Sequence, residues 1–92
     1  LSFRSSQYHP KERVIGIEFN GKFKAYPFAE LSQVKSPLED TFAGQKFTLD
    51  FNNETRNGII RDPQGKVLHS VNAFWFAWYT FHPETEIFSG KN

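Results

Sequence analysis

The sequence predicts a single α+β domain, with a twisted antiparallel sheet of about five strands and a C-terminal aromatic helix packed on one face. Three observations support this prediction. Several short segments alternate between apolar and polar residues, as half-buried strands do. Turn sequences that contain glycine separate several of these segments. Six aromatic residues then lie between positions 74 and 81, with a spacing that fits a helix.

The 92 residues are enough for one domain with one hydrophobic core. We expect residues 1–12 to form an N-terminal arm, because they are polar, lack periodicity and include His9-Pro10. Residues 13–92 are predicted to form the α+β domain.

The first strands are predicted at Arg13–Phe19 and Lys22–Tyr26, which both alternate and are separated by Asn-Gly. A two-residue turn is typical of Asn-Gly, but it would place Ile17 opposite Lys24 and mix core and solvent faces. We therefore predict a three-residue loop that ends in a glycine bulge, so that Ile17 pairs with Phe23.

A short helix is predicted after the first hairpin. Pro27 suits a first helical position, and Phe28–Val34 continues the helix for about two turns. Phe28 and Leu31 then share one face, and Ser36-Pro37 ends the helix.

The central part of the chain has a further strand signal. We expect a short strand around Thr41-Phe42 and a turn at Ala43-Gly44. Lys46–Phe51 then alternates regularly, with its aromatic and leucine residues directed inward.

A second hairpin is predicted from Arg56–Arg61 and Lys66–Val71. They flank Asp62-Pro63-Gln64-Gly65, which has the residues of a type I turn. With the glycine as a bulge, this hairpin pairs Ile60 with Leu68.

The aromatic helix is predicted to begin after Asn72, a suitable N-cap, and to run to about His82, where a proline ends it. Aromatic residues also favour strands, but a strand here would need a sheet covered on both faces. A short final strand is expected within Thr85–Phe88. The predicted core consists of Ile15, Ile17, Phe23, Phe47, Leu49, Phe51, Phe74, Trp78 and Phe81.

Charge and composition narrow the classes of function. The net charge is +1 and no block of like charge occurs, so we expect no nucleic-acid partner. No apolar stretch is long enough for a membrane span in this chain. The absence of cysteine excludes disulfides and thiolate chemistry, and we expect no cofactor.

Three stretches resemble a family of largely bacterial and archaeal proteins, catalogued as domain of unknown function 3179. The stretches are RVIGIEFNGKFKAYPFAEL (Arg13–Leu31), DTFAGQKFTLDF (Asp40–Phe51) and FWFAWYTFHPETEIF (Phe74–Phe88). Longer members of the family carry a paired-cysteine motif where this chain has Asn52-Asn53-Glu54-Thr55, so the chain looks like a short, cysteine-less form. The resemblance implies a fold and an extracytoplasmic location, periplasmic or secreted, but no activity.

The candidate binding residues are Trp75, Tyr79 and His82, which lie on the helix face that is not needed to cover the sheet. The arm at Leu1–Tyr8 could cover this face, or it could remain open for a sugar or a protein partner. His82 with Glu84 and Glu86 also offers metal ligands. A histidine at a helix C-terminus followed by solvated acids is the more ordinary explanation.

The sequence thus predicts a non-enzymatic extracytoplasmic structural or binding module that has a possible protein partner through its aromatic patch. The alternative is a domain that binds a small ligand, a sugar or a metal, or is weakly catalytic. It would use a cleft beside Trp75, Tyr79 and His82.

Overall fold

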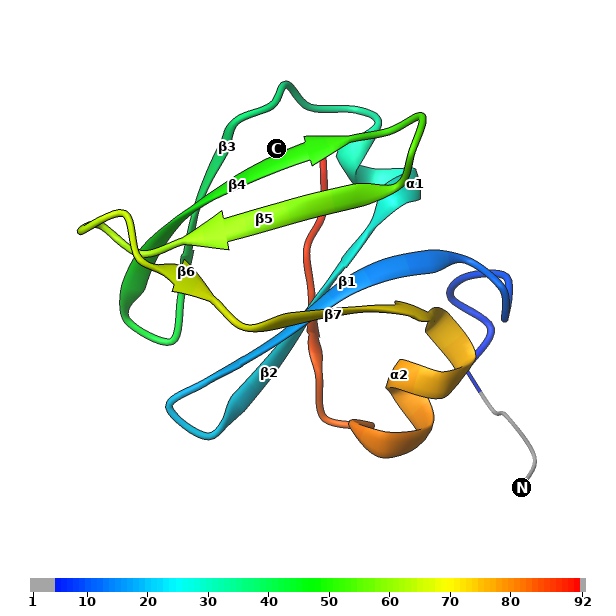
Figure 1. Cartoon of the computed structure of the whole chain (residues 1–92). Helices are drawn as coiled ribbons and strands as arrows, with labels where there is room; N and C mark the ends of the chain where they lie inside the picture. Colours follow the sequence, from blue (N-terminus) through cyan, green and yellow to red (C-terminus); the bar gives the residue numbers. More distant parts are fainter. Residues whose placement is uncertain (1–4, 92) are drawn as a thin grey trace.

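The computed structural model describes residues 5–91 and shows an α+β fold with two four-stranded sheets (Figure 1). The first sheet has the strand order β7-β1-β2-β8, and the second has the order β3-β4-β5-β6. The sequence predicted a single sheet of about five strands, whereas residues 5–91 form two sheets of four strands each. In the described part of the chain, the elements are β1 (Arg13–Phe19), β2 (Lys22–Pro27), α1 (Phe28–Leu31), β3 (Leu38–Phe42), β4 (Gln45–Asn52), β5 (Asn57–Arg61), β6 (Val67–Leu68), β7 (Ser70–Phe74), α2 (Trp75–Phe81) and β8 (Glu86–Ile87).

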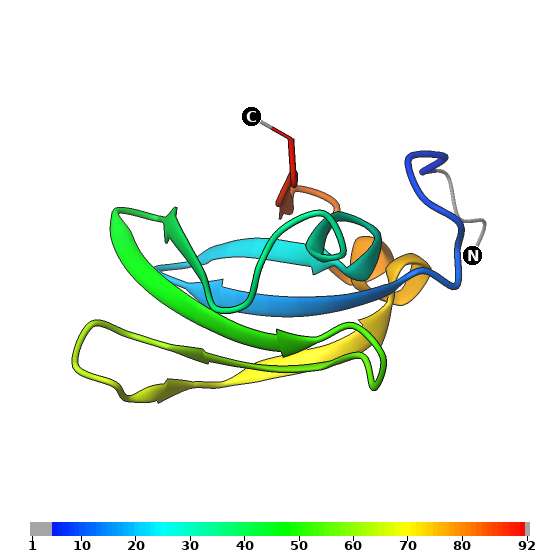
Figure 2. The ribbon, with the colours of Figure 1, turned by 90° about the horizontal axis from the view of Figure 1, so that it is seen from above.

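The chain passes from the first sheet to the second between β2 and β3. It returns at His69, which divides the predicted strand Lys66–Val71 into β6 and β7. Strand β7 pairs antiparallel with β1, and β8 closes the opposite edge as a parallel partner of β2. Figure 2 shows β1 and β2 in one layer and β4 and β5 in another. None of the helices in residues 5–91 is long and apolar enough to cross a membrane.

The β1–β2 sheet is buried on both faces, because alternate residues of β1 enter two different cores. Ile15 and Ile17 join the core between the two sheets, whereas Val14 joins a smaller core with both tryptophans of α2. This explains the uninterrupted buried run Val14–Ile17, since a strand covered on both sides has no solvent face. The aromatic helix covers one face of this sheet, as the sequence predicted.

The three-residue loop predicted for the first hairpin is wrong. Phe19 pairs with Lys22 and Ile17 pairs with Lys24, across a two-residue turn in which Asn20 and Gly21 both have positive φ. The prediction assumed that Lys24 must face water. Lys24 is instead only 8% exposed, because its ammonium group forms an ion pair between the two sheets.

The later turns follow their sequence signals. The backbone N–H of Asp62 donates to the Lys66 carbonyl, and Gly65 has a positive φ. The predicted pair of Ile60 with Leu68 is confirmed. The turn at positions 43–44 also occurs, with positive φ at both residues.

Helix α1 is a single turn, shorter than predicted, with Pro27 at its N-cap position rather than inside the helix. Phe28 and Leu31 are both buried and anchor this turn in the core between the sheets.

Helix α2 ends at Phe81, close to the predicted end at about His82, but begins two residues later than predicted, because β7 continues to Phe74. Asn72 is therefore a strand residue, and its side chain accepts a hydrogen bond from Arg13. The later start directs Trp75 and Trp78 to the sheet. Phe74 and Phe81, predicted as core, are 41% and 78% exposed.

Candidate functional site

Helix α2 is held on the sheet by the position of Trp78. The indole ring lies over Gly16 of β1, where any side chain would collide with it. Its N–H donates to the hydroxyl of Thr85 at 2.9 Å, and the ring of Phe23 packs edge-on at a centroid distance of 6.1 Å. Contacts on three sides thus fix the orientation of this ring.

One side of α2 and the neighbouring strand β7 form an apolar groove of about 420 Å³. Strand β7 contributes two small or medium residues, which leave room beside the helix. The residues that line the groove are Val71, Ala73, Ala77, Trp78, Phe81 and His82.

His82 and Phe81 complete the groove in different ways. The imidazole of His82 is half-buried and stacks on Phe23, with 4.0 Å between the ring centroids and 18° between the planes. The side chain of Phe81, by contrast, is mostly in water. The groove therefore has a fixed aromatic wall on one side and an exposed phenyl ring on another.

The groove is lined without Asp, Glu, Lys or Arg. The fifteen residues from Val67 to Phe81 include no Asp, Glu, Lys or Arg. Within the described residues, five of the six exposed large apolar side chains belong to this stretch: Val67, Val71, Phe74, Phe76 and Phe81. Of these five, Val71 and Phe81 line the groove together, and exposed apolar residues that lie together are typical of interaction surfaces.

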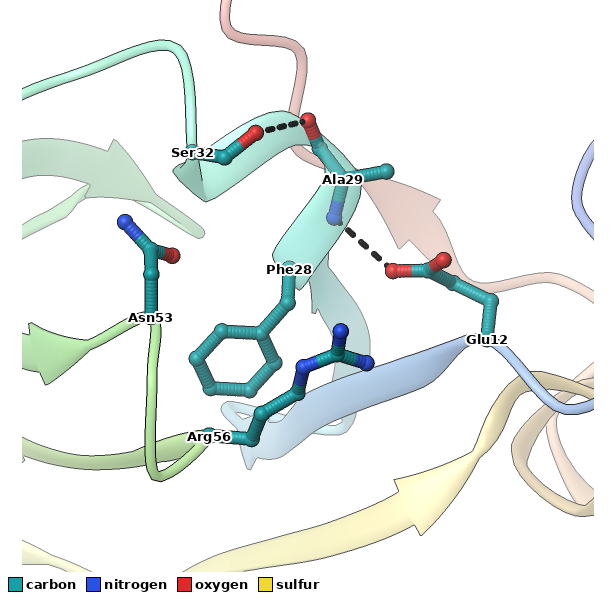
Figure 3. Close-up of a pocket in the computed structure, with 6 residues that line it drawn as sticks. All are labelled: Glu12, Phe28, Ala29, Ser32, Asn53 and Arg56. Atoms are coloured by element: carbon teal, nitrogen blue, oxygen red, sulfur yellow. Dashed lines mark hydrogen bonds between the residues drawn. The ribbon is translucent and has the colours of Figure 1, made fainter.

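A second, smaller hollow of about 170 Å³ lies beside α1 and includes Phe28, Asn53 and Arg56 in its lining (Figure 3). The Glu12 carboxylate accepts a hydrogen bond from the Ala29 N–H at 2.8 Å. The Ser32 hydroxyl donates to the Ala29 carbonyl at 2.8 Å. These polar groups already satisfy the ends of α1, so the hollow is a weaker candidate than the groove.

A buried polar cluster lies between the two sheets. Oδ2 of Asp40 is 2.6 Å from the ammonium group of Lys24, and it accepts a hydrogen bond of 2.6 Å from the Tyr26 hydroxyl. Burial, followed by this hydrogen bond, raises the pKa of Tyr26. The Lys24 ammonium also lies over the ring of Phe42, 5.8 Å from its centroid. We interpret the cluster as a structural link between the sheets.

Of the three predicted binding residues, only His82 lines the groove, whereas Trp75 and Tyr79 pack against each other away from its lining. Trp75 is completely buried, because Tyr8 of the arm packs edge-on against it at 5.5 Å. Tyr79 is half-buried beside Trp75, at 5.2 Å between ring centroids. His82 lines the groove. The part of the arm from Leu1 to Arg4 lies outside the described residues.

Sequence reasoning named only His82 among the six groove residues and missed the other five, two of which, Trp78 and Phe81, were assigned to the core. No sequence signal separated Phe81 from Trp75, because each lies three residues from Trp78 and so about 60° to either side of it on a helix.

The proposed metal ligands do not form a cluster. Glu84 and Glu86 lie beside another hollow, which they share with Lys22. Across residues 5–91, no group of three or more His, Asp or Glu side chains is arranged to hold a metal ion.

Comparisons of the chain with protein-family models, with curated proteins and with solved structures found no match.

Proposed function

We propose that the chain is a non-enzymatic binding module that recognises an apolar partner through the groove between α2 and β7. The observation that carries the proposal is the groove itself, an apolar hollow of about 420 Å³ that no charged residue lines. Its size is within the range of roughly 300–1,000 Å³ that is common for ligand sites.

The lining favours an apolar group over a sugar. Sugar recognition needs several polar groups that converge on the hydroxyls, since unpaired hydroxyls are costly to bury. Among the six lining residues, only Trp78 and His82 carry polar side-chain atoms, and the indole N–H of Trp78 donates to Thr85. A phenyl or branched aliphatic side chain of a partner protein matches this chemistry better.

The fluorescent probe 1-anilinonaphthalene-8-sulfonate tests the proposal, because its emission rises in apolar sites. We expect saturable binding to the wild-type protein that is lost in Ala77→Glu, which places a charge in the groove. Thr80→Glu is the matched control, since Thr80 lies on the same helix, is exposed and does not line the groove. Equal binding by all three proteins would contradict the proposal.

Two further titrations address the alternative function. Glucose and Zn²⁺ are added to the ¹⁵N-labelled protein while the amide and indole signals are followed. Saturable shifts at Trp78 and His82 with either of these, together with no response to the apolar probe, would favour the sugar or metal alternative.

The family resemblance and the extracytoplasmic location remain proposals that rest on the three sequence stretches. Cell fractionation of the source organism, with an antibody raised against this chain, tests the location. Recovery in the cytoplasmic fraction alone would contradict it.

A further inference from the structure

The groove and the exposed Phe81 lie side by side on one surface, which suggests what the partner is. Phe81 is 78% exposed and lines the groove, together with the small side chains of Ala73 and Ala77. A two-fold dimer uses the same surface on both subunits, so that surface must carry both the inserted group and the site that receives it. This surface carries both.

We propose that the partner is a second copy of this chain, with Phe81 of each copy inserted into the groove of the other. This inference rests on the proposed function, since it names the apolar group that the groove binds. The inserted phenyl ring contacts the alanine methyl groups, and its edge lies against the indole of Trp78.

The dimensions of the groove allow this arrangement. An apolar cavity of about 150 Å³ is enough to bind benzene. The groove has about 420 Å³, so it can take one phenyl ring and still leave space for a neighbouring side chain. Val71, which lines the groove and is exposed in the single chain, is also covered when the ring enters.

Charge favours a second copy over a charged partner. The surface contributed by residues 67–81 has no formal charge, and the net charge of the chain is +1, so two copies repel each other weakly. An anionic membrane or a nucleic acid would be attracted by Lys or Arg in the groove, and none of the six lining residues is either. An uncharged surface complements another uncharged surface.

Sedimentation equilibrium from about 10 µM to about 1 mM tests the inference over the range in which modest interfaces associate. We expect the wild-type protein to shift from the mass of one chain to that of two. Phe81→Ser and Ala77→Glu should weaken association by roughly 100-fold, because each change acts twice in a two-fold dimer. Phe76→Ser is the matched control, since Phe76 is exposed on the same helix but does not line the groove.

Intermolecular nuclear Overhauser effects locate the contact in a mixture of labelled and unlabelled chains. We expect effects from the Phe81 ring to the methyl groups of Ala73 and Ala77. Circular dichroism checks that the variants are folded, and because Phe81 is mostly in water its replacement should leave the fold intact. A dimer that Phe81→Ser does not weaken, or one without these effects, would overturn the inference.

The outcomes separate this inference from the proposed function. If the wild-type protein stays monomeric while the probe binds the groove and Ala77→Glu abolishes binding, the function stands and the dimer is wrong. If neither association nor probe binding occurs, both are wrong. Cosedimentation of a monomeric wild-type protein with phosphatidylserine vesicles would overturn the dimer and assign the surface to lipid.

Discussion

The indole ring of Trp78 occupies the space directly above Gly16, so a strand residue and a helix residue fit together as a single packing unit. A Cβ atom at position 16 would lie 2.5 Å from Cε3 of Trp78. Real carbon contacts are far longer, so only glycine allows the helix to approach the sheet this closely. The same contact fixes the wall of the groove, because Trp78 lines it.

Gly16→Ala should therefore destabilise the protein by about 3 kcal/mol, at the upper end for an overpacked core, measured by urea denaturation. In a Trp78→Phe background the smaller ring leaves room, and the same alanine should cost less than half as much. A double-mutant cycle measures this coupling. A cost of Gly16→Ala that is the same in both backgrounds would show that the ring is not the cause.

Local signals predicted the turns well. The hairpin at Asp62–Gly65 has the turn residues that its geometry requires, and the pair of Ile60 with Leu68 follows from the turn alone. The alternation in β4 is also reflected in its burial, with Phe47 and Leu49 buried. Turn chemistry and alternation act over a few residues, so one sequence is enough to see them.

The first hairpin could not be predicted in this way. Its register depends on Lys24, which is buried only because Asp40 lies opposite it in the other sheet. A partner sixteen positions away in another sheet leaves no signal in the alternation of β2. The division into two sheets was also missed. Only one residue, His69, separates β6 from β7, so the sequence looked like one continuous strand.

The sequence predicted one of the groove residues, His82. His82 lies at the end of the aromatic helix, as predicted, but it packs beside Trp78 and not beside Trp75 as the sequence suggested. Trp75 was expected to be available to ligands, but Tyr8, 67 positions earlier, covers it, so that only the tertiary structure reveals its burial. Phe81 was assigned to the core because helical spacing places it on one face with Trp78 and Phe74, but Phe74 is a strand residue, and Trp75 is buried in place of Phe81.

Asp40→Asn should destabilise the protein by about 3 kcal/mol, because it leaves the Lys24 ammonium buried without a counter-charge. Asp50→Asn is the matched control. Asp50 also forms an ion pair, at 2.9 Å from Arg61, but both side chains are well exposed. We expect that change to cost less than about 1 kcal/mol. Equal costs in urea denaturation would mean that burial of the Lys24–Asp40 pair has no energetic effect.

Stability should fall as the pH rises above about 10, where an unfolded tyrosine loses its proton. Burial and a hydrogen bond to Glu30 raise the pKa of Tyr8 to about 12, and the pKa of Tyr26 is raised as well. A tyrosine whose pKa is higher in the folded than in the unfolded protein stabilises the fold fully below the unfolded pKa. This stabilisation is lost as the pH rises towards the folded pKa. The fall in Tm between about pH 9 and about pH 11 should be smaller in Tyr8→Phe/Tyr26→Phe, and an unchanged fall would contradict this assignment.

Tyr8→Ala should uncover the fully buried Trp75, because the tyrosine ring is its edge-on neighbour at 5.5 Å. We expect a red shift of tryptophan emission and a loss of about 2 kcal/mol, from the lost ring contact and the lost hydrogen bond to Glu30. Tyr8→Phe is the control, since it keeps the ring and loses only the hydroxyl, whose bond is worth about 1 kcal/mol. It should show no red shift. If the emission of Tyr8→Ala matched that of Tyr8→Phe, the arm would not be the cover of Trp75 in solution, and Trp75 would again be a candidate for ligand contact.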